Sequence, residues 1–272
     1  MSVTLRALWL AILAIACAVL FAQQPANADA TRLVVGSKRF TESYILAEIV
    51  AQTAAPHGPV EHRPGLGNTA VVFEALKAGA IDIYPEYLGT LDAEILKNPR
   101  PTDLDGMRKQ LAAMGLGVAV PLGFSNGYAL AMKGAQATAL GVKTISGLKA
   151  QPGLAFGLSH EFLGRADGWP GLAARYGLPQ RPTGIDHGIS YEALEAGRIA
   201  VTDIYSTDAK IASLGLTVLD DDLRYFPRYD AVLLYRLDAA QRCPEAWKAI
   251  AKLEGRIDVA AMIRMNGDAE LR

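Results

Sequence analysis

The chain has 272 residues and a formal net charge of −1, with 27 Lys and Arg against 28 Asp and Glu. This balance, with no basic stripe, argues against a nucleic-acid partner. After the N-terminal segment no apolar run is long enough to span a bilayer, so we expect a soluble mature protein.

The first thirty residues have the order of a secretory signal peptide. Arg6 is followed by an uncharged apolar stretch at 7–22 and by two small-x-small sites that end at Ala28 and Ala30. The apolar stretch is shorter than the roughly 20 residues that a membrane anchor needs. We therefore predict cleavage and a periplasmic protein, with lipoprotein anchoring at Cys17 as the less favoured alternative. Cys243 then remains as a lone cysteine, which cannot form an intrachain disulfide.

The mature chain alternates between strand and helix patterns. A short apolar strand at 33–35 and a loop at 36–40 precede a helix that Thr41 can cap and that runs through 54. A second helix follows the turn at 65–68 and runs through 78, where Gly79 closes it. Residues 81–84 form the next strand. Such alternation predicts an α/β fold with mostly parallel strand pairing.

One helix-strand pattern occurs twice. Residues 74–87 read EALKAGAIDIYPEY and residues 192–205 read EALEAGRIAVTDIY, which aligns Tyr87 with Tyr205. The repetition predicts two similarly built lobes, each with a tyrosine at the carboxyl end of a strand. Open α/β sheets bind their ligands at that edge.

The lobe boundaries are placed by turn residues and by two similar segments. Pro and Gly residues punctuate 121–127, and the chain is expected to return near Pro227. Residues 124–132 (FSNGYALAM) and 226–235 (FPRYDAVLLY) are expected to be matched crossing strands. We predict a first lobe from 31–122 with 229–272, and a second lobe from 123–228.

Six segments together resemble the substrate-binding proteins of glycine betaine/choline/proline ABC transporters, which import osmoprotectants. In chain order they are GSKRFTESYILAEI (36–49), LGNTAVVFEALKAG (66–79), DIYPEYLGT (82–90), FSNGYALAM (124–132), EFLGRADGWPGL (161–172) with DHGISYEAL (186–194), and DIYSTD (203–208) with FPRYDAV (226–232). The resemblance covers nearly the whole mature chain. It implies the type II periplasmic-binding-protein fold, in which two α/β lobes joined by two crossover strands close on a solute. It also implies a monomer that needs no cofactor or metal and delivers its solute to a membrane permease.

The same resemblance implies a cage of four tyrosines. A quaternary ammonium has no N–H to donate, so shape, dispersion and electrostatics must recognise it, and aromatic faces supply all three. The family's cage positions correspond here to Tyr87, Tyr128, Tyr205 and Tyr229. Any one of these tyrosines alone would be read as a core ring. The four together favour a quaternary-ammonium ligand.

The family's contacts to the other end of the solute also have counterparts. Lys38, Thr90 and Arg165 match positions that bind a betaine carboxylate, which a guanidinium can hold with two parallel hydrogen bonds. Asn126 matches a polar contact near the cation. Without the surrounding motif, Lys38 and Arg165 would be read as solvated surface cations.

Four residues depart from the family's usual pattern. Ser125 and Gly127 alter the segment before Tyr128, Leu88 replaces a threonine, and Arg228 replaces a proline beside Tyr229. The choice among glycine betaine, choline, carnitine, proline betaine and histidine betaine therefore stays open.

An enzyme is the alternative from a different class, since some two-lobed α/β folds are catalytic. The four histidines have no metal-ligand spacing such as H-E-x-x-H, and the chain contains no G-x-S-x-G motif or phosphate-binding loop. We therefore predict a binding protein and not an enzyme.

Overall fold

The structure is a computed structural model that describes residues 32–271. The expected signal peptide at 1–30, with Cys17, lies outside the described residues. Among the described residues, no helix has both the length and the apolar character needed to cross a membrane.

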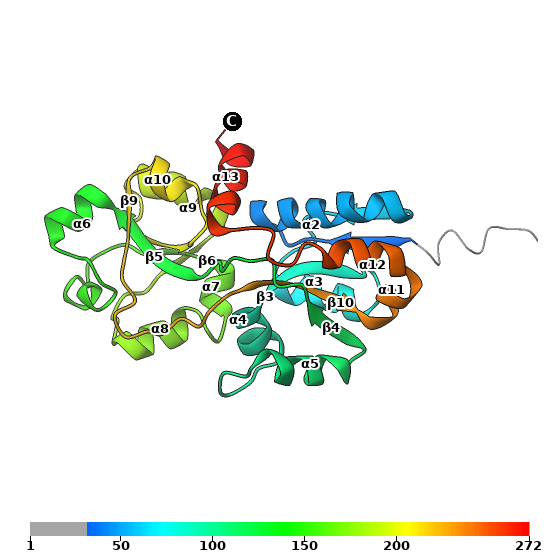
Figure 1. Cartoon of the computed structure of the whole chain (residues 1–272). Helices are drawn as coiled ribbons and strands as arrows, with labels where there is room; N and C mark the ends of the chain where they lie inside the picture. The colour runs from blue at the N-terminus through cyan, green and yellow to red at the C-terminus, as the bar shows by residue number, and fades with distance from the viewer. Residues whose placement is uncertain (1–31, 272) are drawn as a thin grey trace, which may run out of the picture.

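Two α/β halves, each built on its own sheets, lie side by side (Figure 1). The sheet of the first half has the order β2 (Val60–Arg63), β1 (Leu33–Gly36), β3 (Ile83–Tyr87), β10 (Ala231–Arg236), β4 (Leu116–Ala119). The second half has a three-stranded sheet, β8 (Val201–Tyr205), β5 (Tyr128–Lys133), β9 (Leu216–Val218), and a two-stranded sheet, β6 (Gly157–Ser159) and β7 (Thr183–Ile185). We call these halves the first and the second lobe.

Helices pack around both sets of strands. Those of the first lobe are α2 (Thr41–Ala54), α3 (Thr69–Lys77), α4 (Leu88–Thr90), α5 (Leu104–Ala112), α11 (Leu237–Arg242) and α12 (Pro244–Ala251), with a 3-10 turn η1 (Ala55–His57) and a π turn η2 (Leu91–Ile95). Those of the second lobe are α6 (Gly134–Leu140), α7 (His160–Gly164), α8 (Trp169–Tyr176), α9 (His187–Glu195) and α10 (Lys210–Ser213), with a 3-10 turn η3 (Ser146–Ala150). Helix α13 (Val259–Glu270) lies at the junction of the lobes (Figure 1).

The expected α/β class is confirmed, but the expectation of mostly parallel pairing was wrong. β1 pairs in parallel with β2 and β3, and β6 with β7. β10 is antiparallel to β3 and β4, and β5 is antiparallel to β8 and β9. The crossing segments lead into the antiparallel strands β10 and β5. Each of these strands begins beside the last residue of its neighbour, Ala231 opposite Tyr87 and Tyr128 opposite Tyr205, so it must run in the opposite direction.

The repeated helix-strand pattern has the same backbone course in both lobes. Helix α3 leads into β3 and helix α9 leads into β8, and Gly79 and Gly197 end the two helices with φ of 75° and 70°. A positive φ at this position is what favours glycine there. Tyr87 and Tyr205 are the last residues of the two strands, so the repetition places them equivalently.

Two local expectations need correction. Thr41 is the first helical residue of α2 and not its cap, because extended Phe40 occupies the N-cap position without a side-chain cap bond. The strand expected at 81–84 begins at Ile83. Residues 80 and 81 still belong to the turn that leaves α3, since both of their N–H groups donate to the carbonyl of Ala75.

The two crossing segments run antiparallel next to each other. Ser125 and Asp230 form an isolated antiparallel bridge. The N–H of Leu122 donates to Ala231 O, and that of Asn126 donates to Tyr229 O, each over 2.9 Å. This arrangement holds Asn126 and Tyr229 at the junction of the lobes.

Candidate functional site

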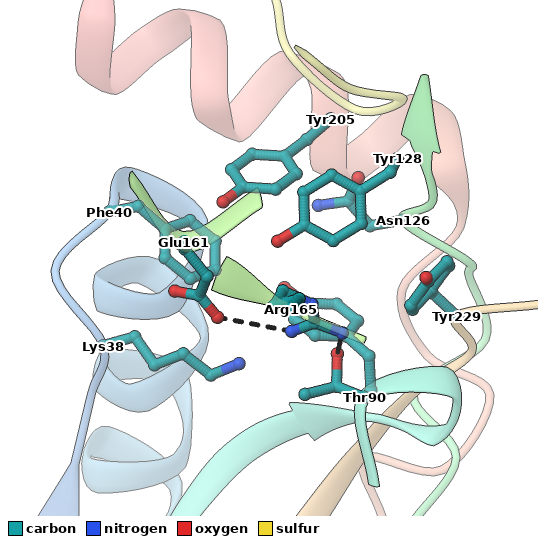
Figure 2. Close-up of a pocket in the computed structure, with 10 residues that line it drawn as sticks. Lys38, Phe40, Thr90, Asn126, Tyr128, Glu161, Arg165, Tyr205 and Tyr229 are labelled. Carbon is teal, nitrogen blue, oxygen red and sulfur yellow. Dashed lines mark hydrogen bonds and ion pairs between the residues drawn. The ribbon is translucent and has the colours of Figure 1, made fainter. Parts of the chain in front are cut away.

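A cavity at the junction is lined by residues from both lobes and both crossing segments (Figure 2). Its lining residues are Lys38, Phe40, Tyr87, Thr90, Asn126, Tyr128, Glu161, Arg165, Tyr205 and Tyr229. All eight residues singled out from the sequence lie in this set, and Phe40 and Glu161 are additional. The free space is about 20 Å³, room for little more than one water molecule.

Aromatic rings form one wall of the cavity. Tyr128 and Tyr205 are cross-strand partners in the β5–β8 ladder, and their ring centroids lie 5.3 Å apart. Tyr229 approaches Tyr128 edge-on, with centroids 5.7 Å apart and an interplanar angle of 82°. Figure 2 shows the hydroxyls of Tyr128 and Tyr205 pointing toward the centre of the site. These rings offer the faces and edges that a cation cage needs.

Phe40 extends this wall from the first lobe. Its ring centroid lies 5.3 Å from that of Tyr205, so the two lobes meet in an aromatic contact. Phe40 was not identified from the sequence; the signal that could have identified it is an aromatic residue two positions after Lys38 in an otherwise polar loop.

Arg165 dominates the polar end of the cavity. Its Nε and Nη2 donate to the two carboxylate oxygens of Asp167 over 2.7 and 2.6 Å, and Nη2 also donates to Thr90 Oγ1 over 3.2 Å. Its guanidinium carbon lies 5.2 Å from the centroid of the Tyr128 ring. Arg165 is 3% exposed, so it is a buried cation and not a solvated surface cation.

Lys38 enters the polar end from the loop after β1. Its Nζ donates to Glu86 Oε1 over 2.5 Å and to Thr69 Oγ1 over 3.2 Å, and it lies 5.4 Å from the Tyr87 ring centroid. The ammonium is therefore held by a carboxylate of its own lobe, and Lys38 as a residue is 4% exposed.

Glu161 approaches both cations from α7 of the second lobe. Its Oε1 accepts from Thr69 Oγ1 over 2.6 Å and from Arg165 Nη1 over 3.3 Å. Burial alone would raise the pKa of Glu161, but the charges of Lys38 and Arg165 and these hydrogen bonds lower it below its usual value. Glu161 is therefore ionised at neutral pH. Nothing in its sequence spacing separated it from a surface glutamate.

A second buried carboxylate, Glu42, lies behind the cavity at the start of α2. Its oxygens accept hydrogen bonds from Tyr87 OH over 2.5 Å, Asn126 Nδ2 over 2.9 Å, Thr207 Oγ1 over 2.5 Å and Asn266 Nδ2 over 3.1 Å. These donors come from both lobes, a crossing segment and α13. Burial raises the pKa of Glu42 above its usual value although all four hydrogen bonds lower it.

His187 backs the aromatic wall on the side of the second lobe. Its ring centroid lies 4.3 Å from that of Tyr205, its Nε2 lies 3.3 Å from Asp208 Oδ2, and its Nδ1 lies 3.9 Å from Asp203 Oδ2. Burial alone would lower the pKa of His187. The hydrogen bond to Asp208, together with the charges of Asp208 and Asp203, outweighs burial and raises it.

We expect His187 to make stability fall as pH rises through neutrality. Because the folded-state pKa is raised, the contribution is complete below the unfolded value of about 6.5 and is lost as pH rises through the folded-state pKa. Thermal melts from pH 6 to 8 should show wild type losing more stability than His187→Gln. The pKa of Glu42 is also raised, but Glu42 is present in both proteins, so its contribution to the pH dependence cancels in the comparison. Parallel curves for the two proteins would contradict the assignment.

A known family model matches the whole of the described chain. The model of the substrate-binding domain of ABC-type glycine betaine transport systems matches residues 31–271. A glycine-betaine-binding protein of Pseudomonas aeruginosa is 36% identical over 279 residues, covering 95% of this chain and 88% of that protein. An ergothioneine transport permease/ergothioneine binding protein of Helicobacter pylori is 33% identical over 260 residues. There the match covers 91% of this chain but only 46% of the relative, so the chain spans about half of that protein's length.

Solved structures share the fold. The structure of a glycine betaine/carnitine/choline ABC transporter protein superposes with a TM-score of 0.68 at 26% identity, covering 88% of this chain and 92% of that one. Lactococcal OpuAC, closed and complexed with glycine betaine, superposes with a TM-score of 0.66 at 12% identity, covering 89% and 90%. At 12% identity, the similarity to lactococcal OpuAC supports a shared fold and nothing more.

Proposed function

Because the chain belongs to the family of substrate-binding domains of ABC-type glycine betaine transport systems, we propose that it holds a quaternary-ammonium solute in the cavity between its lobes and delivers that solute to a membrane permease. The family is one of transporter substrate-binding proteins and not of enzymes. The chain has the type II periplasmic-binding-protein fold of its structural relatives.

The gathering of four tyrosines and Phe40 around one cavity is the observation that supports this proposal. A quaternary ammonium gains about 0.5–2 kcal/mol from each aromatic face, with the larger values reached when water is excluded. Tyr87, Tyr128 and Tyr229 are each less than 10% exposed, so the faces that they offer are dry.

The polar end would hold the rest of the solute. Arg165, Lys38 and Thr90 carry N–H and O–H groups that a carboxylate or hydroxyl can accept from. Asn126 would stay near the cation, as expected from the sequence. Glycine betaine, carnitine and ergothioneine occur in the names of the similar proteins and structures, and all three solutes combine a trimethylammonium group with a carboxylate.

We also propose the setting in which the protein works. Substrate-binding proteins of ABC importers act outside the cytoplasm, which agrees with the predicted signal peptide and periplasmic location. The partner is the permease of the importer, and the protein itself acts as a monomer.

Solute entry is expected to require the lobes to part. The closed cavity has about 20 Å³ of free space, and its walls come from both lobes. A solute that touches both lobes gains its full contact energy only when they shut, and this difference shifts the population toward the closed form.

Calorimetry with glycine betaine and choline, followed by small-angle scattering, tests the proposal. We expect at least one of the two solutes to bind and the radius of gyration to fall at saturation. Absence of binding to any quaternary-ammonium solute would refute the proposed function. Binding with an unchanged radius, starting from an open free protein, would refute closure alone.

A further inference from the structure

The polar end of the cavity has more carboxylates than cations. Lys38 is paired with Glu86 over 2.5 Å, and Arg165 is paired with Asp167 over 2.6 Å. Glu161 is a third carboxylate against these two cations, so the group has a formal charge of −1. Its side chain is 22% exposed and lines the cavity. Glycine betaine, which is a zwitterion, leaves this excess charge without a partner.

Glu161 also has an unused acceptor on the cavity side. Its Oε1 accepts from Thr69 and Arg165, whereas its Oε2 accepts no hydrogen bond within residues 32–271. Figure 2 shows this second oxygen directed away from Arg165, on the side of Phe40 and Lys38. An ionised carboxylate can accept hydrogen bonds but cannot donate them. The group on the solute that can pair with this oxygen is therefore an O–H or N–H donor.

We infer that the cavity selects quaternary-ammonium solutes that carry an O–H or N–H group, and that Glu161 accepts the hydrogen bond from that group. The inference rests on the proposed function and names the class of solute. A hydroxyl can donate to Glu161 and at the same time accept from Arg165, whose Nη1 already points to Glu161. The carboxylate of glycine betaine can only accept, and it would face Glu161 as a like charge.

A second cavity next to the first has room for a larger substituent of the solute, and that substituent can carry the donor. This second cavity has a volume of about 370 Å³ and shares Lys38, Phe40, Glu161 and Tyr205 with the first. Glu161 therefore lies where the two cavities meet. A donor-bearing ring or chain attached to the solute can occupy the second cavity while its ammonium stays among the tyrosines.

A pair of solutes of which only one carries the donor tests the inference. Choline and its O-methyl ether have the same charge and the same trimethylammonium group, and the ether has a methyl group in place of the hydroxyl hydrogen. Isothermal calorimetry with both solutes and with glycine betaine is carried out on wild type, Glu161→Ala and Glu161→Gln. Glu74→Gln is the matched control, because the Glu74 side chain is 66% exposed and does not line the cavity. Circular dichroism and thermal melts establish that each variant is folded.

Wild type and Glu74→Gln should bind choline at least about 10-fold more tightly than the ether, as expected for a hydrogen bond to a charged acceptor. In Glu161→Ala the two affinities should come within about 3-fold. In Glu161→Gln, glycine betaine should gain affinity relative to choline, because the like charge is gone. Equal binding of choline and the ether by wild type, or a gap that persists in Glu161→Ala, overturns the inference while the proposed function stands. Failure of all three solutes to bind to wild type refutes both.

Discussion

Replacing Tyr128 and Tyr205 together with leucine is expected to weaken choline binding by about 1–4 kcal/mol, or roughly 5- to 1,000-fold in Kd. The two rings are cross-strand partners with centroids 5.3 Å apart, and both line the cavity. Leucine keeps an apolar side chain of moderate size but removes the π face that attracts a cation. Calorimetry on the double variant and on each single variant measures the loss.

Tyr235→Leu is the matched control for this prediction. Tyr235 stacks on Trp247, with centroids 4.1 Å apart, and does not line the cavity. Its substitution should lower stability and leave solute affinity within about 2-fold of wild type, because no contact to the solute is removed. If the double cage variant bound choline as tightly as Tyr235→Leu, the aromatic wall would not be the cation site.

Glu42→Ala is expected to have the largest effect on stability, a loss of at least about 3 kcal/mol in the free energy of unfolding. The substitution leaves the donors of Tyr87, Asn126, Thr207 and Asn266 without their acceptor, and all four residues are at most 6% exposed. Each buried donor without a partner costs about 1–3 kcal/mol, although water entering the space left by the side chain offsets part of this. Urea unfolding measures the change.

Two further variants separate the parts of this effect. Glu48 lies on the same helix and its side chain is half exposed. Glu48→Gln should therefore change the free energy of unfolding by less than about 1 kcal/mol. Thr207→Val removes only the hydrogen bond that joins the second lobe to Glu42, so it should weaken solute affinity more than it lowers stability. A Glu42→Ala protein as stable as Glu48→Gln would show that the buried carboxylate does not join these elements.

The local elements and much of the cavity were predictable from sequence because they depend on short segments. The repeated helix-strand pattern correctly placed Tyr87 and Tyr205 at equivalent strand ends. The resemblance to a family then supplied Tyr128, Tyr229 and the polar residues, which line one cavity in the structure. Their contacts with a solute remain predictions.

Other features depend on tertiary structure and could not be read from the sequence. Glu42 has the appearance of an ordinary acidic residue in the first turn of a helix, where the helix dipole favours it. Only folding brings donors from residues 87 to 266 onto it. Glu161 gains its partner Thr69 in the same way, across the lobe junction. Strand direction was misjudged because the alternation of helix and strand does not reveal that a crossing segment enters its sheet at the edge where the neighbouring strand ends.

The shared ladder of β5 and β8 has a consequence for the order of events when a solute arrives. Tyr128 and Tyr205 are joined within one lobe by backbone pairing, so a hinge motion between lobes leaves their spacing unchanged. If the lobes part as proposed, the open protein still presents these two rings as a platform to which a cation can bind first. Phe40, Tyr87 and Lys38 belong to the opposite lobe and would then enclose the bound cation. The proposed closure thus assigns capture to the second lobe and retention to the first.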